Sequence, residues 1–120
     1  ILILADVQVK YAEMLDKDKT MAISVKQAFA AGADGVIVTG PWTGVAPELN
    51  KLNDAKKAAK NMPVIIGSGL TVENSKTLLQ VADGALVGTA IRDESRIDYK
   101  KAKKLATQVK KFKGGKNDNQ

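Results

Sequence analysis

The chain has 120 residues, of which 44% are hydrophobic and 27% charged, a composition typical of one soluble globular domain and not of a disordered segment. It contains no cysteine and no histidine, which excludes disulfides, thiolate metal sites and triads that depend on histidine. The opening apolar run ends at Asp6, far short of the roughly 18 residues of a membrane span, and no basic segment precedes it as in a signal peptide. We therefore expect a cytoplasmic protein with no bound metal and no cofactor.

The positive charge is concentrated at one end of the chain. The net charge is +6, but residues 1–95 carry ten basic and eleven acidic side chains, whereas residues 96–120 carry nine basic and two acidic ones. Nucleic-acid binders usually combine a basic face with aromatic or groove-reading elements. Aromatic residues make up only 4% of this chain and no recognition motif is present, so we do not expect specific nucleic-acid binding. The basic segment suits a peripheral contact with an anionic membrane.

Segments rich in β-branched residues alternate with segments of helical periodicity. Predicted strands cover residues 1–10, 33–40, 63–69 and 82–89. Predicted helices cover residues 20–31, 46–60, 72–81 and about 96–112. Residues 114–120 are polar and read as a flexible tail, which leaves residues 1–113 as the folded domain.

This order predicts an α/β fold with a parallel sheet and right-handed crossovers. The Ala-Asp-Gly sequence at residue 33 recurs at residue 82, one pair of βα units later. Repeated βα units are typical of a TIM (β/α)₈ barrel, which needs about 250 residues. We therefore expect a (β/α)₄ half-barrel with outer helices, and the absence of an initiator Met favours the C-terminal half of a longer chain. Four strands cannot close a barrel, so we expect pairing with the N-terminal half of that parent or with a second copy, and no well-behaved monomer.

The first predicted strand alternates between apolar and polar side chains. Asp6, Gln8 and Lys10 share one face, and because helices cover the outside of a barrel, this face points into the lumen. A lumen-facing Lys10 beside Asp6 could act as a general acid, a phosphate clamp or a Schiff-base amine. The alternative is a structural ion pair that plugs the barrel.

Glycine-rich loops follow the third and fourth predicted strands. The first contains Gly67, Ser68 and Gly69, and the second contains Gly88, Thr89 and Ala90. Backbone amides in such loops can approach an anion, and barrel phosphate sites frequently lie after two successive strands. We predict a phosphate site here, although glycine turns and threonine caps also occur without a ligand.

The loop after the second strand is long for a βα connection. Its Thr39, Gly40, Trp42 and Thr43 predict either a substrate-facing wall or a lid-like turn against a neighbouring loop. Asp34 and Asp83 stand at strand entrances, where a turn-forming role is the better account.

Four blocks of this sequence together resemble one known family. They are residues 6–10, 38–44, 63–74 and 82–89. In this order they resemble the C-terminal half of the BtpA/SgcQ family, which implies a TIM-barrel type of about twice this length and an association with photosystem I biogenesis. Relatives carry His where this chain has Tyr11, and Ser and Lys where it has Ala90 and Arg92. The first departure argues against a histidine-dependent step here.

Two functions remain open. The first is a barrel protein that binds a small phosphorylated metabolite, with lyase-, isomerase- or aldolase-like chemistry at Asp6 and Lys10 if it is an enzyme. The second is a non-enzymatic assembly factor, peripheral to a membrane, in which the barrel is a scaffold.

Overall fold

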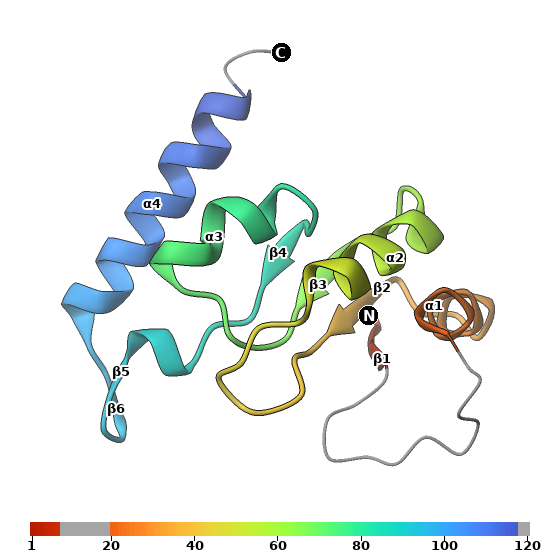
Figure 1. The fold of residues 1–120 in the computed structure, drawn as a ribbon, viewed down its shortest axis with the longest axis horizontal. Coiled ribbons are helices and arrows are strands. Elements are labelled where there is room, and N and C mark those ends of the chain that lie inside the picture. The colour runs from red at the N-terminus through yellow and green to blue at the C-terminus, as the bar shows by residue number, and fades with distance from the viewer. Residues whose placement is uncertain (8–19, 118–120) are drawn as a thin grey trace.

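A computed structural model describes residues 1–7 and 20–117 of the chain (Figure 1). The elements that build the sheet and its helical layer are β1 (Leu4–Val7), α1 (Met21–Ala30), β2 (Gly35–Val38), α2 (Leu49–Ala59), β3 (Val64–Ile66), α3 (Val72–Leu79) and β4 (Gly84–Ala85). They are followed by the short 3-10 helix η1 (Thr89–Ile91), the strands β5 (Arg92–Asp93) and β6 (Arg96–Ile97), and the helix α4 (Tyr99–Asn117).

The main sheet runs β1-β2-β3-β4, and every neighbouring pair in it is parallel. The spatial order follows the chain order, so right-handed crossovers place successive helices on the same face. A doubly wound sheet would instead reverse direction at a switch point. The described residues therefore form the predicted (β/α)₄ half-barrel.

The core lies between the sheet and its helices. Val36, Val38, Val64 and Ile66 are fully buried there, and Leu52 of α2 packs into the same cluster. The alternate strand residues lie on the opposite face, where Ile37 and Ile65 are only half-buried and Leu86 is 53% exposed. The period of two thus divides the strands between a packed outer face and an open inner face, which corresponds to the lumen of a barrel.

The helix N-termini follow local rules that the sequence makes visible. The Thr20 hydroxyl accepts a hydrogen bond from Ile23 N at the start of α1. Thr71 and Asn74 form a reciprocal capping box at the start of α3. Both helices therefore begin where the sequence predicts.

The start of the last helix differs from the prediction. Residues 92–97 form an antiparallel hairpin in which Arg92 pairs with Ile97, so the predicted helix start at residue 96 is wrong. The Asp98 carboxylate accepts a hydrogen bond from Lys101 N, and α4 begins after it. Ile97 fits the apolar periodicity of α4, and this match extended the predicted helix back into the hairpin. In the structure Ile97 belongs to β6 and is 63% exposed. At its other end α4 continues to Asn117, so its last turn lies in the segment expected to be a tail.

Candidate functional site

The loops after β2 and β3 meet at the carboxyl end of the sheet. Ser68 joins them, because its hydroxyl accepts a hydrogen bond from Gly40 N at 3.1 Å and donates one to Val45 O at 2.8 Å. The side chain is buried, so it holds the two loops together and does not face solvent. The predicted site residues Gly40 and Ser68 therefore do come together, with a structural role visible for the hydroxyl.

Two glycines allow these loops to approach so closely. Gly69 has a φ of +80°, and a Cβ there would collide with the backbone nitrogen of Ala46. A Cβ at Gly40 would collide with the carbonyl oxygen of Val45. Close loop packing thus accounts for both glycines independently of any ligand.

Gly67 lies on the inner face of the sheet beside Thr39. A Cβ at Gly67 would collide with Thr39 Cγ2 and crowd the side chain of Ile37. The Thr39 hydroxyl is buried and has no hydrogen-bond partner among the described residues. Since buried polar atoms are usually paired, this hydroxyl is a candidate contact for a molecule in the lumen.

The loop after β4 brings a cation to the same end of the sheet. The atom nearest to a Cβ built on Gly88 is Arg92 Nη2, at 3.9 Å. A Cβ built on Gly44 would lie 3.3 Å from the Thr89 hydroxyl, so the loop after β2 also reaches this point. Gly88, Thr89 and Arg92 are all exposed. The sequence identified Arg92 only as a departure from the family pattern. The signal that could have revealed it is a cationic side chain four residues after Gly88, the glycine at the end of the predicted strand.

Trp42 and Thr43 are exposed in the loop between β2 and α2, and Trp42 keeps 61% of its surface accessible. Ala90 is half-buried within η1, next to the exposed pair Gly88 and Thr89. These positions agree with either a substrate wall or a lid, and the two interpretations remain predictions.

Asp6 stands apart from these loops. It is exposed, and it pairs in register with Ile37 on the inner face, while its neighbour Val7 is buried under the helices. Its orientation therefore follows the predicted alternation. Lys10 and Gln8 lie outside the described residues. Because β1 and β4 are the two edges of the described sheet, Asp6 is three strand spacings, about 14 Å, from β4, and Gly88 lies in the loop that follows β4.

The repeated aspartates serve the other end of the sheet. Asp34 accepts a hydrogen bond from Ile3 N at 2.8 Å and donates its own N–H to Ile3 O. Asp83 makes the same pair of bonds with Val64, and Lys56 Nζ lies 2.7 Å from its carboxylate. Each aspartate therefore fastens the start of the preceding strand, which explains the internal repeat without any chemistry.

Comparison with known proteins places the chain in a family. Residues 1–111 match the BtpA family. The chain belongs to the BtpA family. A family member from Archaeoglobus fulgidus, an uncharacterized protein, is 34% identical over 91% of this chain and 43% of its own length. An uncharacterized protein of Pyrococcus furiosus is 40% identical over 82% of this chain and 36% of its own length. The photosystem I biogenesis protein BtpA of Synechocystis is 38% identical over 82% of this chain and 34% of its own length.

The BtpA family is of TIM-barrel type, which agrees with the half-barrel described above. The chain spans less than half the length of these curated relatives. No helix in the described part of the chain is long and apolar enough to cross a membrane.

Proposed function

We propose that the carboxyl end of the sheet binds the phosphate group of a small metabolite, with the Gly88–Arg92 loop as its main contact. The observation that carries the proposal is the Arg92 guanidinium beside Gly88, at the end of β4. Arginine presents several N–H donors in a planar fork that matches phosphate oxygens. Gly88 leaves the backbone open to an anion, and the neighbouring Thr89 adds a hydroxyl donor.

The neighbouring loop completes the proposed pocket on the side of β3. Gly67, Ser68 and Gly69 form its wall through their backbone, since the Ser68 hydroxyl is already engaged by the loop after β2. The buried Thr39 hydroxyl is the contact we assign to the part of the metabolite that enters the lumen. Trp42 and Thr43 form the outer wall.

If the bound metabolite is also transformed, we assign the reacting or orienting carboxylate to Asp6 on the inner face. Its predicted partner Lys10 lies outside the described residues, and the pairing of the two remains a prediction from the alternation of the strand. An amine and a carboxylate would suit lyase-, isomerase- or aldolase-like chemistry.

Calorimetric titration with a pentose 5-phosphate, with the unphosphorylated pentose as a parallel, tests the proposal. We expect binding of the phosphorylated sugar only, and a loss of affinity of about tenfold or more in Arg92→Gln, because a charge-assisted hydrogen bond is worth about 1.5–3 kcal/mol. Arg96→Gln is the matched control, since Arg96 is exposed on the other strand of the same hairpin. Equal affinity for both sugars, or unchanged affinity in Arg92→Gln, would refute the phosphate site.

A second function, a non-enzymatic assembly factor peripheral to a membrane, is supported by the surface around the start of α4. Lys100, Lys103 and Lys104 are exposed on its first turns, and Ile97 and Tyr99 expose large apolar surface beside them. Basic side chains next to apolar ones suit an anionic lipid surface, where each cation contributes about 1 kcal/mol. The name of the Synechocystis relative, photosystem I biogenesis protein, points in the same direction.

Sedimentation with vesicles separates this function from the first. We expect binding to vesicles that contain phosphatidylglycerol and not to pure phosphatidylcholine, with a loss of binding in Lys103→Glu/Lys104→Glu. The control is Lys57→Glu/Lys60→Glu, which makes the same charge change on exposed lysines near the end of α2. An equal loss of vesicle binding in both double variants would show that binding depends only on net charge, and it would refute the assignment to this surface.

A further inference from the structure

The loop between β2 and α2 presents Trp42, the only tryptophan of the chain, on a fixed turn. Val45 N donates a hydrogen bond to Trp42 O at 3.1 Å, which closes a turn of four residues. Gly44, the third residue of this turn, has a φ of +80°, a conformation that glycine adopts readily at that position. The Val45 carbonyl in turn accepts the hydrogen bond of the buried Ser68 hydroxyl. The backbone that carries the indole is therefore anchored to the loop after β3.

The same turn lies against the loop that we assign to the phosphate. A Cβ built on Gly44 would be 3.3 Å from the Thr89 hydroxyl, so the turn closely approaches the start of η1. Two residues of extended chain span at most about 7 Å, which limits the backbone distance between Trp42 and Gly44. A phosphate at Thr89 and Arg92 and a group on the indole could therefore belong to one small molecule.

The indole is exposed although its backbone is fixed. Trp42 keeps 61% of its surface accessible, and the strand before its loop, β2, has a neighbour on both sides. An aromatic side chain on a fixed backbone offers a flat apolar face at little cost in conformational entropy. Planar rings suit such a face best, because they stack on it over their whole area and need no matching polar groups.

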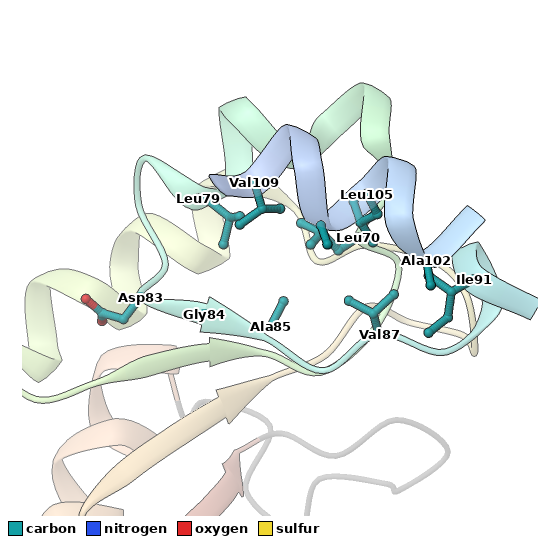
Figure 2. A pocket seen from close by; sticks show the side chains of 11 residues that line it. Leu70, Leu79, Asp83, Gly84, Ala85, Val87, Ile91, Ala102, Leu105 and Val109 are labelled. Carbon is teal, nitrogen blue, oxygen red and sulfur yellow. The ribbon is translucent and has the colours of Figure 1, made fainter. Parts of the chain in front are cut away.

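The apolar cavity beside β4 does not suit a phosphorylated ring. This cavity of about 460 Å³ lies between the sheet and α4, with Ala85 and Val87 on the strand side and Leu105 and Val109 on α4 (Figure 2). The charged residue among those that line it is Asp83, a carboxylate that would repel a phosphate. The turn with Trp42 is therefore the better place for the ring.

We propose that the metabolite is a phosphate ester that carries a planar heterocycle, as a nucleotide does, and that Trp42 stacks on this ring. The inference rests on the proposed phosphate site. The phosphate contacts Arg92 and Thr89, the ring covers the indole, and the sugar between them lies over the carboxyl ends of the strands. There the buried Thr39 hydroxyl, which has no partner among the described residues, is available to a sugar hydroxyl.

Calorimetric titration with three probes separates the ring from the phosphate. Adenosine 5′-monophosphate carries both groups, ribose 5-phosphate carries only the phosphate, and adenosine carries only the ring. We expect the monophosphate to bind at least about fivefold more tightly than ribose 5-phosphate, the lower limit for a base stacked on an aromatic side chain. Because Trp42 is the only tryptophan, the monophosphate should also change the tryptophan fluorescence, and ribose 5-phosphate should not.

Substitutions at Trp42 assign the difference to the indole. Trp42→Leu should lower the affinity for the monophosphate to that for ribose 5-phosphate, whereas Trp42→Phe, which keeps a ring, should retain part of the advantage. Met62→Ala is the matched control, since Met62 is an exposed apolar side chain just before β3, at the opposite end of the sheet. It should keep the full difference. Arg92→Gln should weaken the binding of both phosphorylated probes.

The outcomes distinguish the stacking contact from the phosphate site. Equal affinities for the monophosphate and ribose 5-phosphate, or a difference that persists in Trp42→Leu, would overturn the stacking contact and leave the phosphate site standing. Equal affinities for the monophosphate and adenosine, both dependent on Trp42, would refute the phosphate site and support the ring contact alone. A chain that binds none of the three probes would refute both.

Discussion

The carboxylate of Asp83 makes two interactions at the amino end of the parallel strands. It accepts hydrogen bonds from Val64 N and from Lys56 Nζ, and Val64 itself is fully buried. Removal of the carboxylate leaves a buried N–H without its acceptor, which costs about 1–3 kcal/mol. We therefore expect Asp83→Ala to lower the free energy of unfolding by that amount in urea titrations.

The matched control for this aspartate is Asp54→Ala on the exposed face of α2. It removes the same group without a bond to the sheet, so its effect should stay within about 0.5 kcal/mol. If the two variants unfold at the same urea concentration, the fastening role of the repeated Ala-Asp-Gly sequence is wrong.

A comparison of Gly69 with Gly32 distinguishes the stability cost of backbone strain from the cost of disturbed loop packing. Both have positive φ, but a Cβ at Gly32 meets nothing within 4 Å, whereas one at Gly69 would collide with Ala46. Gly32→Ala should cost about 1–2 kcal/mol for its conformation alone. Gly69→Ala should cost clearly more, because the loops must also move apart. Thermal unfolding of both variants checks the order, and equal costs would contradict the close packing of the loops.

At the scale of single elements, α3 depends on its capping box. Thr71→Ala removes the hydroxyl that accepts from Asn74 N, and such caps are worth about 0.5–2 kcal/mol. Thr77→Ala, on an exposed position of the same helix, loses a threonine without a cap and should be close to neutral. Urea midpoints that fall equally in both variants would show that the helix start is held by packing alone.

Element boundaries were predictable where a local rule sets them. Thr20 and Thr71 mark helix starts through their own side-chain hydrogen bonds, which the sequence displays directly. The β5–β6 hairpin was not predictable in the same way. Its Ile97 fits the apolar period of the following helix, and only the pairing with Arg92 and the carboxylate of Asp98 places the boundary.

For the whole molecule, stability depends on the core between the sheet and its helices. Leu52 of α2 is fully buried there, whereas Leu49 of the same helix is 41% exposed. We expect Leu52→Ala to lower the free energy of unfolding by about 2–5 kcal/mol in urea titrations, because it leaves a cavity, and Leu49→Ala to lower it clearly less. Equal costs in the two variants would contradict the packing of α2 onto the sheet.

The amino-acid sequence alone predicts the parallel half-barrel, its helices and the inward position of Asp6, because strand alternation, helical period and capping are local properties of neighbouring residues. It also placed the Gly67 and Gly88 loops at one end, since parallel strands all end on the same side. The folded structure was needed to define the roles of the residues at that end. It assigned Ser68 and Gly69 to loop packing, brought Arg92 to Gly88 and left a cavity beside β4. These features depend on distances between segments far apart in the chain, which no local pattern encodes.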